Sequence, residues 1–208
     1  MSVCAVLLVV YQANRPAEAA ARAENDPTRV AERLQHELAR TRGELADANQ
    51  QIERWQRVFG FATSYDIAVD LATDIHDIAV AEGIEPELAF RLVRLESSFD
   101  ERATSPVGAI GLAQVMLPTA RYFQKDITRE TLYERETNLR IGFRYLRALV
   151  EENNGDVRLA LLTYNRGPTA VRLALRNGHD PSNGYDRILM RGYTGTGIIE
   201  TSLSGSEE

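Results

Sequence analysis

One glutamate stands out among the residues that could do chemistry, because it lies inside an apolar helical run. Residues 92–117 read LVRLESSFDERATSPVGAIGLAQVML, and Glu96 follows Ala89, Leu92 and Val93 at helical spacing. On a helix these four residues share one face. A carboxylate beside apolar side chains loses hydration, which favours its protonated form and suits a general acid. An isolated glutamate near a helix end is more often a solvated or capping charge, so the position alone leaves both interpretations open.

Two other segments carry polar groups that could complete a site. Ser105 and the loop GAIGLAQ, which ends at Gln114, follow the glutamate. The two glycines permit close approach of the backbone, and the amide can donate and accept. Farther on, LLTYNRGP places Tyr164 and Asn165 at the end of a helix. An aromatic ring with amides suits a carbohydrate ligand. The structural alternative for this pair is a helix end with Asn165 in the left-handed conformation.

The elements that must position these residues are helices. Apolar residues recur at helical spacing, with Pro86 and Asp156 as start signals and Gly83 as a stop signal. No alternating strand pattern extends over a useful length. We therefore predict an all-α domain. The expected helices cover residues 66–82, 85–97, 118–123, 138–152, 156–164, 169–176 and 185–190.

A heptad pattern precedes this domain, after a helix start at Asp26 and Pro27. Mostly apolar residues follow one another at alternating gaps of four and three residues, and charged residues occupy other positions of the helix. One interpretation is a coiled-coil stalk that forms a homo-oligomer through residues 34–59; the other is an amphipathic helix that lies on its own domain. The seam consists of Leu34, Leu38, Thr41, Leu45, Ala48, Ile52, Trp55 and Phe59.

The N-terminus carries an apolar run over residues 3–11, about half of the ~20 residues that span a bilayer. It lacks a preceding positive stretch. We favour a truncated export signal or membrane anchor over a buried strand or helix. The expected organisation is an apolar segment (1–12), a coiled-coil-like helical stalk (13–60), a globular domain (64–195) and a disordered polar tail (196–208).

Composition narrows the function further. The chain has 208 residues, of which 44% are hydrophobic, a net charge of −6 and a pI of about 5.3, which disfavours nucleic acid as a partner. A single cysteine rules out an internal disulfide framework. The three histidines are scattered, and the sequence has no nucleotide fingerprint, so we expect neither a metal site nor a cofactor.

Three motifs together resemble a known family. ESSF…SPVGAIGLAQVM…TA, then N…IG..YL, then YNRGP, are similar to the SLT-type (family 1) lytic transglycosylases, relatives of goose-type lysozymes. The resemblance implies a lysozyme-like α-helical domain in the bacterial cell envelope (the periplasm or the outer face of the inner membrane). It also implies cleavage of the β-1,4 bond between N-acetylmuramic acid and N-acetylglucosamine in peptidoglycan, with 1,6-anhydromuropeptides as products.

The same resemblance implies roles for individual residues. Glu96 is similar to the single catalytic acid/base, and Ser105 and Gln114 to residues that contact the sugars. Tyr164 and Asn165 match the Tyr-Asn pair of the family, and Tyr185 in NGYDRIL resembles the tyrosine of its last helix.

The chain also departs from the family pattern. Ala113 replaces a larger methionine that lines the groove, and Leu117-Pro118 moves a proline by one position. PSNG stands where an acidic pair usually precedes Tyr185, and Asp100 and Glu101 are expected to face solvent. Two alternatives stay open: a lysozyme-like hydrolase on the same fold, and a non-catalytic glycan-binding or coiled-coil scaffold.

Overall fold

The computed structural model describes residues 26–199, which belong to two compact units, residues 1–56 and 57–208. Helix α2 (Pro27–Tyr65) begins where Asp26 accepts a 3.0 Å hydrogen bond from the backbone N–H of Thr28, as the sequence predicts. The long helix before the domain is thereby confirmed. Within residues 26–199, every helix is too short or too polar to cross a bilayer. The apolar run at 3–11 lies outside the described residues.

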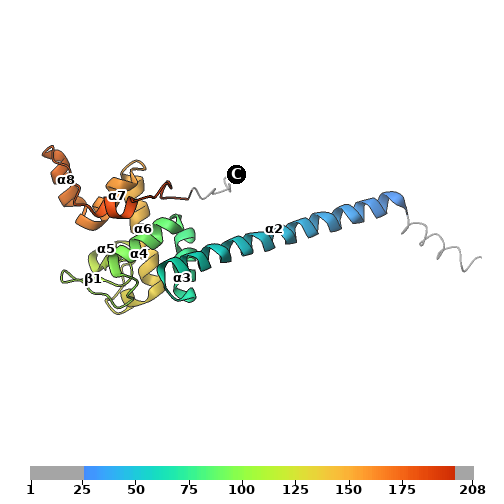
Figure 1. Cartoon of the computed structure of the whole chain (residues 1–208), viewed down its shortest axis with the longest axis horizontal. Coiled ribbons are helices and arrows are strands. Elements are labelled where there is room, and N and C mark those ends of the chain that lie inside the picture. The colour runs from blue at the N-terminus through green and yellow to red at the C-terminus, as the bar shows by residue number, and fades with distance from the viewer. Residues whose placement is uncertain (1–25, 200–208) are drawn as a thin grey trace, which may run out of the picture. The chain divides into compact units, whose positions relative to one another are not determined.

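The globular unit is all-α, as expected, and its helices follow one another from green to red in Figure 1. All seven expected helices are present, and their ends are shifted by three residues or fewer. A 3-10 turn at Thr131–Tyr133 adds to them. The helices are α3 (Val69–Ala81), α4 (Pro86–Ser97), α5 (Leu117–Phe123), α6 (Arg135–Glu152), α7 (Val157–Arg166), α8 (Pro168–Arg176) and α9 (Tyr185–Met190).

The core is built around the apolar face of α4. Leu88, Ala89, Leu92 and Val93 are fully buried and pack with apolar residues of α3, α6, α7 and α9 in one cluster. Burying side chains of this size contributes about 1.5–3 kcal/mol for each large residue. The helix that carries Glu96 is therefore held on several sides.

The all-α domain contains one short hairpin that the sequence did not indicate. β1 (Ala109–Ile110) pairs antiparallel with β2 (Val115–Met116) inside the segment that we read as a loop. Each strand has only two residues, so no alternation of polar and apolar residues could reveal it. The connection turns through Gly111 and Gln114, both with positive φ.

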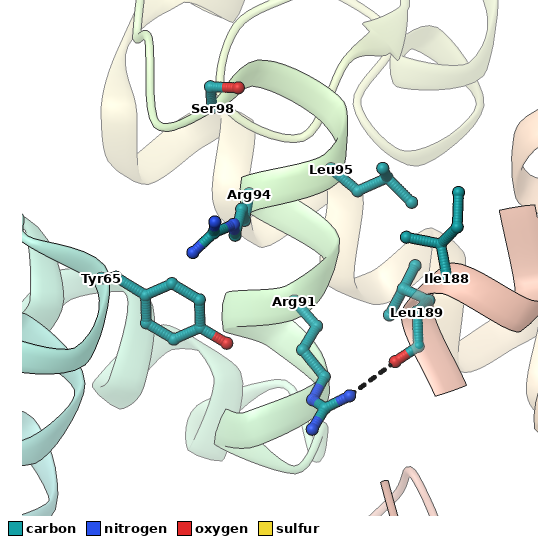
Figure 2. A pocket seen from close by; sticks show the side chains of 7 residues that line it. All are labelled: Tyr65, Arg91, Arg94, Leu95, Ser98, Ile188 and Leu189. Atoms are coloured by element: carbon teal, nitrogen blue, oxygen red, sulfur yellow. Dashed lines mark hydrogen bonds between the residues drawn. The ribbon is translucent and has the colours of Figure 1, made fainter. Parts of the chain in front are cut away.

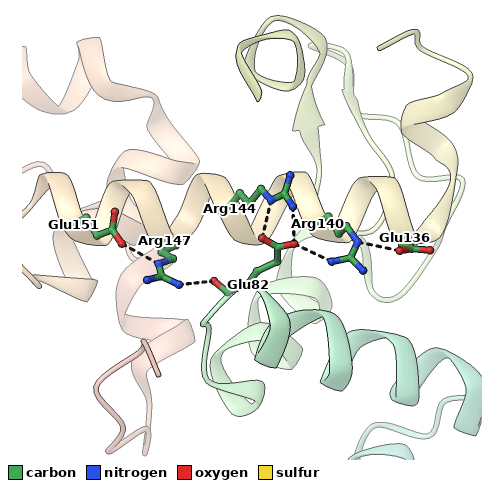
Figure 3. A network of polar contacts seen from close by, with 6 residues as sticks. All are labelled: Glu82, Glu136, Arg140, Arg144, Arg147 and Glu151. Carbon is green, nitrogen blue, oxygen red and sulfur yellow. Dashed lines mark hydrogen bonds and ion pairs between the residues drawn. The ribbon is translucent and has the colours of Figure 1, made fainter. Parts of the chain in front are cut away.

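A buried glutamate fixes the end of α3 to α6, as Figure 3 shows. Glu82 is only 8% exposed, and its carboxylate accepts hydrogen bonds from Arg140 at 3.0 Å and Arg144 at 2.7 Å. Glu136 pairs in turn with Arg140 at 2.9 Å. A buried carboxylate is tolerated when it is paired and hydrogen-bonded, and removing one partner is costly. This network holds the turn that leads into α4.

The disordered tail was predicted to begin at residue 196, which is too early in the chain. Residues 196–199 form a strap against the start of α4, where Glu85 accepts from the backbone N–H of Thr196 at 2.9 Å and from the hydroxyl of Tyr193 at 2.6 Å. Ile198 also forms a bridge with Ile84. Residues 200–208 lie outside the described part of the chain.

Candidate active site

Glu96 lies in the last turn of α4, on the face that the sequence predicts. Its helical neighbours Ala89, Leu92 and Val93 are fully buried, while Glu96 itself is half-buried. Burial raises the pKa of Glu96 above its usual value, and a hydrogen bond from the Tyr185 hydroxyl to Oε1 offsets part of this rise. The net effect keeps a proton on the carboxyl group to higher pH, as a general acid requires.

Tyr185 reaches Glu96 because the start of α9 is fixed to α7. The adjacent Asp186 is 1% exposed and forms an ion pair with Arg158 of α7. Ser182 donates a second hydrogen bond to Asp186 at 3.0 Å. Burial alone would raise the pKa of Asp186, but these two hydrogen bonds and the arginine charge hold it below its usual value. Asp186 therefore remains ionised and paired, and α9 cannot turn freely.

The end of α9 is fixed to α4 by Arg91. Its Nη1 donates to the main-chain oxygens of Leu189 at 2.9 Å and Arg191 at 2.7 Å. These carbonyls lie at a helix C-terminus, where they have no partner within the helix. Figure 2 shows the first of these bonds at the edge of a pocket of about 340 Å³, to which Arg94 of α4 also contributes. This pocket lies on the face of α4 opposite to Glu96, so we assign Arg91 a positioning role.

Tyr164 joins α7 to the hairpin. Its hydroxyl donates a 2.7 Å hydrogen bond to the carbonyl of Ala113. Burial and, after it, the negative charge of Glu96 raise the pKa of Tyr164 well above its usual value, so this hydroxyl stays protonated. Gly142 of α6 makes the contact possible, because a Cβ there would lie 2.4 Å from the Cβ of Ala113 and 3.2 Å from the Tyr164 hydroxyl.

A groove of about 300 Å³ opens beside Tyr164, and Gln114 and Asn165 also line it. Three of its wall residues, Thr119, Tyr145 and Pro168, are shared with a neighbouring hollow of about 460 Å³. The two hollows therefore adjoin each other at these three residues. The groove is lined by Val107, Gln114, Val115, Met116, Thr119, Tyr145, Tyr164, Asn165, Arg166, Gly167 and Pro168.

The side-chain amide nitrogen of Gln114 is hydrogen-bonded within the protein, and its amide oxygen is not used in the same way. Its amide nitrogen donates to the carbonyls of Gly111 at 2.9 Å and Ala103 at 3.3 Å. The amide oxygen is therefore the group that remains for a ligand.

Asn165 accepts a 2.8 Å hydrogen bond from the side-chain amide of Asn183. Asn183 also accepts one from the backbone N–H of Tyr185 at 3.2 Å, so the Tyr-Asn pair is connected to the start of α9. Helix α7 continues to Arg166, and Gly167 takes the positive φ, so the alternative of a left-handed Asn165 is wrong.

Asn138, the first residue of the motif N…IG..YL, is a structural residue of the site to which the sequence analysis assigned no individual role. It is 1% exposed, and its amide oxygen accepts from the backbone N–H of Ala113 at 2.8 Å. Its nitrogen donates to the carbonyls of Ile110 at 2.8 Å and Leu132 at 2.9 Å. A buried asparagine on an otherwise apolar helix face is the signal that could have revealed it.

The structure places two further loop residues. Ser105 is not among the residues that line this groove; its hydroxyl accepts a 3.0 Å hydrogen bond from the backbone N–H of Ala109, and its contact with the sugars stays a prediction. Ala113 is fully buried against Gly142, so its side chain does not line the groove either. Leu117 and Pro118 form the first turn of α5, so the shifted proline is compatible with a helix start.

The two carboxylates that follow Glu96 in the sequence, Asp100 and Glu101, bind other groups. Glu101 forms a 2.6 Å ion pair with Arg135, and Asp100 accepts a 2.8 Å hydrogen bond from the backbone N–H of Arg102. Arg135 also pairs with Asp74 at 2.8 Å. Within residues 26–199, no group of three or more histidine, cysteine, aspartate or glutamate side chains is arranged to hold a metal ion.

Comparison with known proteins agrees with the motifs. The chain is 35% identical over 100 residues to the soluble lytic murein transglycosylase of Salmonella typhimurium, a match that covers 45% of this chain and 16% of the relative. It is 31% identical over 130 residues to the transglycosylase of Enterobacteria phage PRD1, covering 60% of this chain and 47% of the relative. It is 32% identical over 128 residues to membrane-bound lytic murein transglycosylase C of Actinobacillus pleuropneumoniae, covering 55% and 34%.

The chain thus spans only part of the length of these relatives. The family described as Transglycosylase SLT domain matches residues 75–184, which is more than half of the chain and includes Glu96, the hairpin and the groove. The chain belongs to the transglycosylase SLT domain family, the SLT-type lytic transglycosylases.

Proposed function

We propose that this protein is a lytic transglycosylase that cleaves the β-1,4 bond between N-acetylmuramic acid and N-acetylglucosamine in peptidoglycan. One observation carries the proposal: Glu96 is half-buried, has a raised pKa and accepts a hydrogen bond from Tyr185, and its charge also raises the pKa of Tyr164, which lines the groove. The amides of Gln114 and Asn165 line the same groove and suit sugar hydroxyl or N-acetyl groups. The names of the relatives support this substrate class.

In the proposed reaction, one carboxyl group performs both proton transfers. Protonated Glu96 first donates its proton to the glycosidic oxygen, and the bond from that oxygen to C1 breaks. The N-acetyl group of the sugar stabilises the positive charge at C1. Ionised Glu96 then takes the proton of the 6-hydroxyl, whose oxygen forms the new bond to C1. The product is a 1,6-anhydro sugar, Glu96 regains its proton, and no water is consumed.

The surroundings of Glu96 support a single-carboxylate mechanism. Ordinary glycosidases use a second carboxyl group, either about 5–5.5 Å or about 6.5–9.5 Å from the first. The neighbouring Glu101 is paired with Arg135, and Asp100 is hydrogen-bonded to the backbone of its own loop. The Tyr185 hydroxyl, rather than a carboxylate, donates a hydrogen bond to Glu96, and burial and then Glu96 itself raise the pKa of Tyr185 well above its usual value.

Product analysis separates this proposal from its alternatives. The full chain is incubated with purified peptidoglycan sacculi, and the released muropeptides are identified by mass spectrometry. A lytic transglycosylase releases anhydromuropeptides, whereas a lysozyme-like hydrolase releases products heavier by one water, with reducing ends. Binding to sacculi without any released product would instead support a glycan-binding scaffold.

We also propose that the chain acts in the bacterial cell envelope, where its polymeric substrate is found, with residues 3–11 as an export signal or membrane anchor. Relatives of both kinds, soluble and membrane-bound, carry names that refer to murein. Cell fractionation of bacteria that express the full chain tests this: recovery from the envelope supports it, and recovery with the cytoplasmic proteins contradicts it.

A further inference from the structure

Helix α2 carries an apolar seam that the proposed chemistry does not use. Leu34, Leu38, Leu45 and Ile52 follow one another at heptad spacing, and each is 50–60% exposed. Side chains of this size gain about 1.5–3 kcal/mol each when they leave water. A continuous exposed stripe of this kind on a long helix marks a surface for another helix.

The residues beside the seam favour two strands over a larger bundle. From Gln35 to Gln56 they are polar or charged and are exposed along the helix, whereas Val58, which precedes Phe59, is buried in the core of the globular unit. In a two-stranded coiled coil these flanking positions stay in contact with water, whereas bundles of more strands bury part of them. The flanking residues are Gln35, Arg42, Asn49 and Gln56 on one side and Glu37, Glu44 and Gln51 on the other.

The charged residues beside the seam favour a parallel orientation of two α2 helices. In a parallel coiled coil, the residue directly before Leu38, Leu45 or Ile52 faces the residue that is five positions later in the partner strand. Glu37 then faces Arg42 of the second copy, and Arg42 faces the second Glu37, so two attractive pairs form. Within residues 26–199, neither residue already forms an ion pair with its own chain; the nearby pair is Arg40 with Glu44.

We propose that α2 pairs with α2 of a second copy as a parallel, in-register, two-stranded coiled coil. Equivalent residues then face each other, Thr41 against Thr41 and Ala48 against Ala48. Because the strands are parallel, both globular units follow the same end of the coil, and two grooves are joined on one stalk. On a polymeric glycan, two linked sites bind more tightly than one. The pairing itself does not depend on the proposed transglycosylase activity.

Cysteine cross-linking in the full chain tests both the pairing and its direction. The natural Cys4 is first replaced by serine, and Thr41→Cys and Ala48→Cys are then introduced separately. The matched control is Ala46→Cys, since Ala46 is also an exposed alanine of α2 but lies outside the seam. Oxidation is followed on non-reducing gels, and the mass in solution is measured by analytical ultracentrifugation.

We expect a dimer in which both seam variants cross-link at least about tenfold faster than the control. Seven residues separate the two seam positions, about 10 Å along the helix. An antiparallel pair can bring only one of them opposite its own copy, so a dimer in which one variant or neither cross-links would overturn the parallel arrangement. A monomer across the micromolar range, or a trimer, would overturn the dimer. Release of muropeptides by the same preparations tests the proposed function separately.

Discussion

The hydroxyl of Tyr185 donates a hydrogen bond to Oε1 of Glu96, although 89 positions separate the two residues in the chain. Arg158 fixes one end of α9 and Arg91 the other, so this contact depends on three helices. The tyrosine favours the ionised form of Glu96, whereas burial favours the protonated form. In the mechanism that we propose, Glu96 alternates between these forms, and the opposing effects make both of them accessible.

Tyr185→Phe removes the group that stabilises ionised Glu96. We expect the pKa of Glu96 to rise further, so that the alkaline limb of the pH–rate profile moves to higher pH. A hydrogen bond to a charged group contributes about 1.5–3 kcal/mol, so the rate should fall by about ten- to a hundredfold. Rates of muropeptide release between mildly acidic and mildly alkaline pH measure both effects.

The matched control for this variant is Tyr193→Phe. Tyr193 has the same 8% exposure as Tyr185, and it also donates to a carboxylate, but to Glu85. Its variant should keep the wild-type pH profile. Equal shifts in the two variants would mean that the Tyr185–Glu96 bond does not set the pH dependence.

Arg91→Gln should lower activity, although Arg91 is not one of the residues that line the groove. The variant loses the donors to Leu189 and Arg191, so α9 is less firmly held against α4. We expect a stability loss of about 1–3 kcal/mol and a fall in kcat larger than the change in KM. The control is Arg94→Gln, because Arg94 is exposed on the same face of α4 and its guanidinium lies over the ring of Tyr65, without a side-chain hydrogen bond to any residue between 26 and 199. If both variants behave alike, Arg91 has no positioning role.

Gly142→Ala should disturb the packing of the hairpin on α6. The added methyl group would lie 2.4 Å from the Cβ of Ala113, so the hairpin must move. Overpacking of this kind costs about 1–3 kcal/mol. The matched control is Gly60→Ala in α2, where nothing lies within 4 Å and the substitution should stabilise the helix by about 1 kcal/mol.

The double variant Gly142→Ala/Ala113→Gly then tests the cause directly. Removing the methyl group of Ala113 makes room for the new one, so stability in urea denaturation should largely return. If the double variant is no more stable than Gly142→Ala alone, the clash is not the source of the loss.

Glu96 should also lower the stability of the fold at neutral pH. Its pKa in the folded protein is raised, so its contribution to stability is fully present below the pKa of the unfolded chain and is lost as pH rises through the folded value. Glu96→Gln, which cannot ionise, should therefore be more stable than the wild type at neutral pH, and the difference should shrink in acid. Denaturation curves at both pH values measure it, and a less stable Glu96→Gln at neutral pH would contradict the burial argument.

The sequence predicted the helices and the face of Glu96 because helical periodicity is a local property. Ala89, Leu92 and Val93 are buried as their spacing requires. Contacts between distant segments have no such signature. The Tyr185–Glu96 bond, the Arg91 bonds to α9 and the amide network of Asn138 join residues far apart in the chain.

The errors arose where local chemistry was ambiguous. Two-residue strands are too short for a pattern, so the hairpin was read as a loop. The resemblance suggested a groove position for residue 113, but an alanine packed against Gly142 is buried there.

The central claim is that Glu96 alone acts as both acid and base. Its most direct test is the yield of anhydromuropeptides from sacculi digested by the wild type and by Glu96→Gln, with the fold of the variant checked by circular dichroism. We predict a loss of at least about a hundredfold in a folded variant, the scale that general acid–base catalysis supplies. Wild-type amounts of anhydromuropeptides from folded Glu96→Gln would contradict the claim.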